Sequence, residues 1–369
     1  MATYLSHGGQ NIQRSARRDG ALVVATVDGV VFLSRAADGR WKEDRRELPG
    51  THVSAIVLEP GSGTLFAGTH GQGLYASADG GRTWERRSEG LVSQHIYSMN
   101  CVQAGAETRV YAGTEPANLS VSTDLGKTWT LLPRLREQPT VDTWSFPAPP
   151  HDAHLKSIGF DPRTPATIYA SVEVGALLKS GDAGATWRSL PVPYEDVHRV
   201  AIHESAPDHV YISTGKGIYH SPDAGEQWEQ LTDQSMRVGY PDALIIHPDQ
   251  PQLLFTAGAI VWPRDWPKYQ TADPRIARSR DGGRTWEVTD RGLPEHIFGN
   301  IEAMALNVWQ GGYALFAGTT DGEIFTSDDG GDSWSMMISE LPAISKTSHH
   351  TRLASFRGGP APEPIKLRA

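Results

Sequence analysis

The stretch Ser77-Ala78-Asp79-Gly80-Gly81-Arg82-Thr83-Trp84 decides the fold, because its pattern returns along the whole chain. Further copies of Ser-x-Asp-x-Gly-x-Thr-Trp, or close variants of it, end at Trp129, Trp187, Trp228, Trp286 and Trp334, and a degenerate first copy runs from Ser34 to Trp41. The final tryptophans of successive copies are 41 to 58 positions apart. Repeats of about 40 to 50 residues, rich in short strands and glycine turns, are typical of β-propellers with one four-stranded sheet per repeat. Seven copies therefore predict seven blades.

Residues 52–88 illustrate the predicted layout of one blade. Apolar or alternating runs at 52–57, 64–69, 73–77 and 83–86 predict four antiparallel strands between glycine-rich turns. The same layout predicts an all-β, seven-bladed propeller as a single domain over 1–369, with blades near 21–45, 52–88, 95–133, 154–190, 197–231, 242–290 and 300–338.

Ring closure is predicted from the C-terminal end. The segment 8–20 before the first blade is polar and has little strand character, whereas residues 344–353 follow the last repeat where another first strand would fall. We expect 344–353 to close blade one as its innermost strand, which would remove the open edges of the ring. Residues 358–369 are predicted to form a loose tail.

The repeated motif has a physical purpose in a turn. Serine and aspartate side chains can hydrogen-bond to the turn backbone, and glycine tolerates a positive φ. On these residues the chain resembles the Asp-box propellers, also called bacterial neuraminidase repeats, over about residues 20–355. In that family the box joins the third and fourth strands, on the face opposite the usual binding site. The resemblance implies a structural role for Asp79, Asp124, Asp182, Asp223, Asp281 and Asp329.

The resemblance implies a scaffold and no particular activity. The family contains sialidases, sortilin-like receptors, xyloglucan-active hydrolases and a photosystem II assembly factor. A sialidase would need the motif Phe/Tyr-Arg-Ile-Pro, which this chain lacks. An assembly role on chlorophyll proteins would be expected to come with an arginine patch and an export signal, and neither stands out in the sequence.

The composition of the chain indicates which classes of binding partner and which cellular compartment to expect. A net charge of −9 argues against nucleic acid or an anionic membrane surface as partner. The chain has no apolar run long enough for a membrane span, and residues 1–10 do not read as a secretory signal, so we expect a cytoplasmic protein. Its single cysteine, Cys101, fits a reducing compartment. Small molecules, glycans and proteins remain as partners, and the oligomeric state is left open.

Two long connections, at 134–153 and 258–274, are predicted to lie on the same face, opposite the repeated motif. Long loops on a rigid scaffold often carry binding residues, so we expect a substrate-binding wall there. The alternative is that both loops only pack on each other or on a partner. The expected substrate contacts are Trp144, Trp262, Arg264, Trp266, Tyr240, His52 and His95.

Histidines and carboxylates gather at the starts of the first strands of blades four and five. As catalytic residues we expect His154, His198, Glu173 and Asp196, and as ligands of one divalent metal, Zn, Fe, Mn or Cu, His151, His154, His198 and Glu173. A metal-free reading, with histidine as general base and Arg199 or Arg264 holding an anion, stays open. Another alternative that stays open is that these residues only line a polar, water-filled channel mouth. The sequence contains no glycine-rich phosphate-binding loop, so we expect no nucleotide cofactor.

These residues favour a small-molecule enzyme with a histidine and carboxylate site at the channel mouth: a hydrolase, a lyase or a metal-dependent oxidase. The alternative is a protein or glycan interaction module that uses the same aromatic residues as a contact surface. A third possibility is a glycoside hydrolase, which needs two carboxylates across a cleft. Glu173, Asp196, Asp242, Asp265, Glu302 and Asp321 supply candidates for that pair without a preferred choice.

Overall fold

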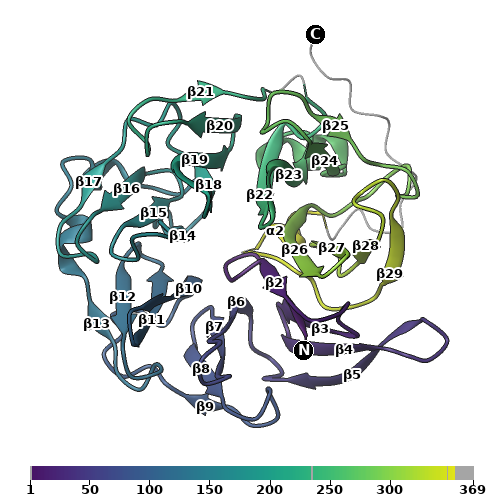
Figure 1. Ribbon diagram of the computed structural model, residues 1–369, viewed down its shortest axis with the longest axis horizontal. Coiled ribbons are helices and arrows are strands. Elements are labelled where there is room, and N and C mark those ends of the chain that lie inside the picture. The colour runs from purple at the N-terminus through teal and green to yellow at the C-terminus, as the bar shows by residue number, and fades with distance from the viewer. Residues whose placement is uncertain (1, 234–235, 347, 354–369) are drawn as a thin grey trace.

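The computed structural model describes residues 2–233, 236–346 and 348–353, whose strands form seven sheets arranged as a ring (Figure 1). Six sheets have four strands and one has five, and the first four strands of each repeat follow one another outward from the centre. The prediction of an all-β, seven-bladed propeller is confirmed. None of the helices in the described ranges has the length and apolar character that crossing a membrane requires.

The strand bounds are given blade by blade, from the channel outward. Blades one to three contain β1 (Thr3–Leu5), β3 (Ala21–Thr26), β4 (Gly29–Arg35) and β5 (Trp41–Glu47); β6 (Val53–Leu58), β7 (Leu65–Thr69), β8 (Gly73–Ser77) and β9 (Glu85–Arg86); and β10 (Ile96–Ala104), β11 (Glu107–Thr114), β12 (Leu119–Ser122) and β13 (Thr130–Leu131). Blades four and five contain β14 (Leu155–Phe160), β15 (Ile168–Val172), β16 (Ala176–Ser180) and β17 (Arg188–Ser189); and β18 (Val197–His203), β19 (Ala206–Thr214), β20 (Gly217–Ser221) and β21 (Glu229–Gln230). Blades six and seven contain β22 (Tyr240–His247), β23 (Gln250–Ala259), β24 (Arg275–Ser279) and β25 (Glu287–Val288); and β2 (Ile12–Arg14), β26 (Ile301–Trp309), β27 (Gly312–Thr319), β28 (Ile324–Ser327) and β29 (Ser335–Ile338).

Short helices lie only in connections: η1 (Pro133–Arg136), η2 (Val141–Thr143), η3 (Pro263–Asp265), α1 (Trp266–Tyr269) and α2 (His349–Arg352). Most residues of the middle strands are buried, because neighbouring blades pack against both faces, and most of these buried residues are apolar. The fourth strands are mostly two polar residues long, which suits an exposed sheet edge.

The repeated motif forms the turn between the third and fourth strands. In the first complete copy, Ser77 Oγ accepts a hydrogen bond from Gly81 N at 2.8 Å, and Asp79 Oδ1 accepts one from Thr83 N at 2.9 Å. Gly81 has a φ of +79°, a conformation that favours glycine. The carboxylates of the other five copies accept the equivalent backbone bond: Asp124, Asp182, Asp223, Asp281 and Asp329. These turns define the lower face of the ring, and the first strands begin at the upper face.

The ring is closed from the N-terminal end, so the prediction of a closing strand at 344–353 is wrong. Strand β1 pairs in parallel with β3, Thr3 opposite Leu22 and Leu5 opposite Val24. The described residues of 344–353 form no strand and include helix α2. Leu5 supplies the apolar side chain that the blade interior requires, whereas the polar residues of 344–353 find charged partners in the channel. The predicted tail, 358–369, lies outside the described residues.

After β1 the chain crosses the channel, and β2 then adds to β26 as a parallel fifth strand near the centre of the ring (Figure 1). The crossing residues are held by backbone bonds from Gly8 N to Ser54 O at 3.1 Å and from Met99 N to Gly8 O at 2.8 Å. Arg199 donates to the carbonyl of His7 at 2.5 Å. Below this crossing, the N-terminal segment lines a cavity of about 750 Å³ in the lower half of the channel.

Gly8→Ala is expected to destabilise the protein by at least about 3 kcal/mol, since overpacking against atoms that cannot move is costly. A Cβ at Gly8 would lie 2.1 Å from the backbone oxygen of Tyr97. Urea unfolding of the purified variant measures the loss. Gly20→Ala is the control, because nothing lies within 4 Å of its Cβ position, and it should stay within about 0.5 kcal/mol of the parent. Equal stability of both variants would contradict the crossing path.

Candidate functional site

The upper mouth of the channel contains a cluster of buried, oppositely charged side chains. We call it the acid–lysine cluster and define it as Glu173, Asp242, Glu302, Lys156 and Lys346, all of which are at most 3% exposed. Lys156 lies in β14, Asp242 in β22 and Glu302 in β26, so three blades contribute through their innermost strands. Glu173 follows β15 directly, and Lys346 comes from the segment after the last blade. Residues distant in the chain thus meet at one end of the channel.

A repeated backbone feature directs these side chains. The innermost strands of blades two to seven each have a register shift at their second or third residue, so one residue of each strand is left out of the pairing. Such bulges redirect a side chain and are common next to functional sites. The residues at the shifts are Ser54, Tyr97, Lys156, His198, Asp242 and Glu302.

Lys346 is the central cation of the cluster. Its Nζ lies 2.6 Å from Asp242 Oδ1 and 3.2 Å from Glu173 Oε1. Burial by itself would lower the pKa of Lys346, but the carboxylates of Asp242 and Glu173 raise it well above the usual lysine value. The side chain is therefore a buried ammonium ion, balanced by two carboxylates.

Glu173 is the central anion. Its Oε2 lies 2.6 Å from His154 Nε2 and 3.4 Å from Lys156 Nζ, while its Oε1 faces Lys346. Burial alone would raise the pKa of this carboxyl, yet Lys156 and Lys346 hold it well below its usual range. The carboxylate of Glu173 is thus balanced by two ammonium groups.

Lys156 and Asp242 complete the charge balance of the acid–lysine cluster. Burial lowers the pKa of Lys156 to about 8, against the opposing effect of Glu173. Asp242 has a pKa of about 2, because Lys346 and His198 outweigh the effect of burial. Asn300 donates to the second oxygen of Asp242 at 2.8 Å. Lys156 Nζ makes no hydrogen bond within the described residues, and it is balanced by the carboxylate oxygens of Glu173 at 3.4 Å and Asp242 at 3.8 Å.

His154 is enclosed between carboxylates and aromatic rings. Its Nδ1 lies 3.3 Å from Glu115 Oε2, on the side opposite Glu173. The ring stacks on Tyr97 with centroids 3.6 Å apart, and Phe146 from the long connection covers it at 4.7 Å. The imidazole is fully buried. It therefore positions Glu173 rather than facing an open pocket.

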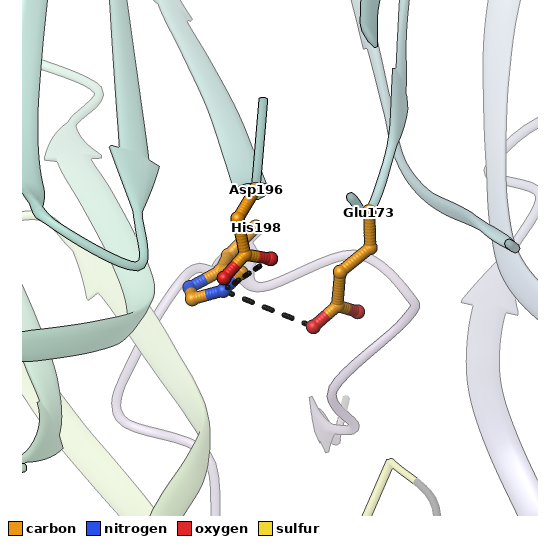
Figure 2. Close-up of side chains that lie close together, drawn as sticks. All are labelled: Glu173, Asp196 and His198. Carbon is orange, nitrogen blue, oxygen red and sulfur yellow. Dashed lines mark ion pairs between the residues drawn. The ribbon is translucent and has the colours of Figure 1, made fainter. Parts of the chain in front are cut away.

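Figure 2 shows Glu173 opposite Asp196 and His198, which come from the start of β18. His198 Nε2 lies 3.2 Å from Asp196 Oδ1 and 3.8 Å from Glu173 Oε1. Its other ring nitrogen, Nδ1, lies 2.7 Å from the carbonyl oxygen of Pro241. Burial would lower the pKa of His198, but the Asp196 carboxylate outweighs burial and raises it. Chemically, the three groups form one imidazole and two carboxylates facing a common point.

The C-terminal segment, which we define as the described residues 344–346 and 348–353, lies at the mouth, forms no strand and contains helix α2. His52 Nε2 donates to the carbonyl of Ser345 at 2.8 Å, and His70 Nε2 donates to the carbonyl of Lys346 at 3.0 Å. Burial lowers the pKa of both imidazoles, which fits neutral donors. Glu302 accepts from the backbone N–H of Lys346 at 2.8 Å and from the ring of His349 at 2.6 Å. Backbone and side chains of the segment are thus both recognised.

The structure brings together most of the residues that the sequence suggested for the site. His154, His198, Glu173 and Asp196 meet at the mouth, and Tyr240 lies against His198 with ring centroids 4.7 Å apart. His52 contacts the C-terminal segment. Two histidines do not join: His95 and His151 are exposed, and His151 Nδ1 instead lies 2.9 Å from the carbonyl of Phe146. His151, one of the expected metal ligands, therefore does not lie with the other three; it adopts a positive φ of 72° in the loop.

The aromatic residues of the long connections do not form an open substrate wall. Trp266 is fully buried and packs edge-on against His349, with centroids 5.1 Å apart. Arg264 is exposed and lies 4.5 Å over the ring of Trp262, outside the channel. Trp144 packs partly buried against the core of blades three and four. These loops support the C-terminal segment and the blade edges.

Sequence reasoning missed Lys156, Lys346 and His349. Lys156 could not be found from strand alternation, because the register shift between Leu155 and Ser157 interrupts that alternation. Lys346 and His349 were hidden because their segment was read as a strand of blade one. Only the path of that segment into the channel reveals them.

Residues 175–304 match the family described as Sortilin, neurotensin receptor 3, which is less than half of the chain. A curated relative is the photosystem II assembly lipoprotein Ycf48 of Synechococcus sp. (strain CC9902). It is 23% identical over 304 residues, which are 81% of this chain and 79% of that protein.

Solved structures resemble the chain at low identity. An ancestral GH74 enzyme has a TM-score of 0.61 at 18% identity, and the match covers 78% of this chain but 39% of that enzyme. YCF48 bound to D1 peptide gives 0.55 at 14% identity, covering 87% of this chain and 93% of that one. The WD40 β-propeller domain of Doa1 gives 0.56 at 10% identity, with 85% and 90% covered. The likeness concerns the fold alone.

Proposed function

We propose that this protein is a protein-binding module whose upper channel mouth receives an extended peptide segment with a buried lysine. The observation that carries the proposal is the way Ser345, Lys346 and His349 are held. Two neutral histidines donate to consecutive backbone carbonyls, Glu302 accepts from the backbone, and two carboxylates surround the lysine ammonium. Those are the elements of peptide recognition: main-chain bonds for affinity and a charged pocket for one side chain.

The C-terminal segment then acts as an internal occupant of the mouth. Because it is tethered, its effective concentration at the site is in the millimolar range, so an external peptide must compete with it. The relative solved as YCF48 bound to D1 peptide supports a peptide partner for a propeller of this shape. The turn hydrogen bonds of the six aspartates also support our assignment to the Asp-box propellers.

The enzyme hypothesis has less support. Glu173, His154 and His198 are fully buried, and the ammonium of Lys346 occupies the side of Glu173 that a substrate would approach. For a glycoside hydrolase the same difficulty applies to Glu173 and Asp242, because both are ionised and share one lysine. Catalysis would require the C-terminal segment to leave.

Lys346→Met in the full chain is expected to open the mouth to an external peptide. The variant keeps the segment but removes the ammonium that Asp242 and Glu173 bind. A fluorescent peptide of residues 341–353, measured by anisotropy, should bind the variant at least about tenfold more tightly than it binds the parent, because the internal competitor is weakened.

The matched control is the same peptide with methionine in place of its lysine, which should bind the variant at least about tenfold more weakly than the lysine peptide. Circular dichroism verifies that the variant is folded. If both peptides bind alike, or if neither binds the folded variant, the mouth is a structural plug and the proposal fails.

A further inference from the structure

We propose that Glu173, Asp196 and His198 form a binding site for a divalent transition-metal ion, for which Zn²⁺ is the probe. One imidazole nitrogen and two carboxylate oxygens are a ligand set that Zn²⁺ accepts, and Mn²⁺ accepts it as well. One ligand atom from each residue lies within 4.8 Å of the other two. This inference shares Glu173 with the peptide proposal, but it also rests on Asp196 and His198, which the peptide proposal does not use.

The spacing suits a single ion. Metal–ligand bonds of about 2.0 to 2.2 Å in a tetrahedral site place neighbouring ligand atoms about 3.3 to 3.6 Å apart. His198 Nε2 lies 3.2 Å from Asp196 Oδ1 and 3.8 Å from Glu173 Oε1, on either side of that range. Figure 2 shows the Glu173 carboxylate on one side of His198 Nε2 and the Asp196 carboxylate next to it.

Two of the ligand atoms have no hydrogen-bond partner although they are buried: His198 Nε2 and Asp196 Oδ1. At 3.2 Å they are close enough to bond, so it is their direction that prevents the hydrogen bond. Buried polar atoms are nearly always satisfied, and two unsatisfied ones facing the same point indicate a missing partner. A cation between them would satisfy both.

The second nitrogen of His198 supports the same reading. Its Nδ1 lies 2.7 Å from the carbonyl oxygen of Pro241, and a carbonyl can only accept, so Nδ1 carries the proton. When the ring is neutral, Nε2 carries the lone pair that can bind a metal, as in metal-bound histidines whose other nitrogen donates to a backbone carbonyl. The Asp196 side chain is 13% exposed, which provides a route from solvent to the site.

Lys346 opposes the metal. Its ammonium lies 3.2 Å from Glu173 Oε1, the oxygen nearest His198, so the two cations compete for one carboxylate. Removing the ammonium should therefore strengthen metal binding. Within the described residues, Asp196 makes no hydrogen bond to the C-terminal segment, whose lysine is bound by Glu173 and Asp242. Removing the Asp196 carboxylate should therefore abolish metal binding without weakening the binding of the segment at the mouth.

The test is isothermal titration of Zn²⁺ into untagged, chelator-treated full-length protein, with plasma mass spectrometry to count bound zinc. We expect one zinc per chain in the parent. Asp196→Asn, which keeps shape and loses charge, should weaken binding at least about 100-fold, and Lys346→Met should tighten it about tenfold.

A second pair of histidines, one exposed and one buried, supplies the control for adventitious zinc. His209 Nδ1 lies 2.9 Å from His220 Nε2, and His220 contacts Glu229 at 2.7 Å. His220→Gln should leave the zinc stoichiometry and affinity unchanged. No zinc in the parent and in Lys346→Met, or zinc that is lost in His220→Gln and kept in Asp196→Asn, overturns the proposal. Either of those results leaves the peptide titration with Lys346→Met interpretable, because it is run without metal.

Discussion

Glu173→Gln is expected to lower the free energy of unfolding by about 3 to 5 kcal/mol, the usual cost of removing one partner from a buried ion network. The side chain keeps its size but loses its charge, which leaves the ammonium groups of Lys156 and Lys346 in a buried site with one fewer carboxylate. Urea unfolding followed by tryptophan fluorescence measures the loss.

Glu115→Gln is the matched control for that variant. Glu115 is also a carboxylate next to His154, at 3.3 Å, but its side chain is 19% exposed and therefore partly screened by solvent. Its replacement should cost less than about 1 kcal/mol, as for a surface ion pair. If Glu173→Gln were as stable as this control, the cluster would have to be hydrated and open, and both proposals for the mouth would lose their structural basis.

Leu5→Asp is expected to destabilise the protein by at least about 4 kcal/mol, or to prevent folding at 37 °C, because an ionised carboxylate would enter an apolar core. Leu5 is fully buried between the first and last blades, in one cluster with Leu22, Ala303 and Ile344. Its strand is the one that completes blade one, so the substitution acts on closure of the ring. Thermal unfolding by calorimetry gives the size of the effect.

Ile12→Asp tests the same chemistry on the other N-terminal strand. Ile12 lies in β2, is only half-buried and packs at the edge of its core cluster. We expect less than half of the loss seen for Leu5→Asp, since the carboxylate can stay hydrated. If Leu5→Asp and Ile12→Asp both unfolded at the same temperature as the parent, another segment would have to close the ring.

The sequence repeat alone was sufficient to predict the seven-bladed architecture. Each copy of the motif carries its own turn chemistry, and each run of alternating residues specifies a strand through contacts that are local in the chain. For this reason the strands of blade two differ from their predicted bounds by only one or two residues. The gathering of His154, His198, Glu173 and Asp196 also followed from the sequence, because topology alone brings the starts of first strands to one mouth.

The segment that closes the ring could not be predicted from local sequence patterns. Thr3–Leu5 is too short to show a period, while 344–353 occupies the expected place after the last repeat. The choice depends on which segment gains more from burial across the ring. Leu5 fills an apolar site between blades, and Lys346 gains two carboxylates only if its segment enters the channel. Both energies come from partners hundreds of residues away.

By itself, then, the sequence of this protein determined the seven blades, their turns and the face on which the polar residues collect, because those depend on local patterns repeated seven times. Only the tertiary structure decided which residues complete the site. The register shifts in six innermost strands turn Lys156, Asp242 and Glu302 into the channel, against the simple alternation of a strand. The C-terminal segment then adds Lys346. The physical reason is charge: a buried carboxylate needs a cation, and the chain supplies it from wherever the fold allows.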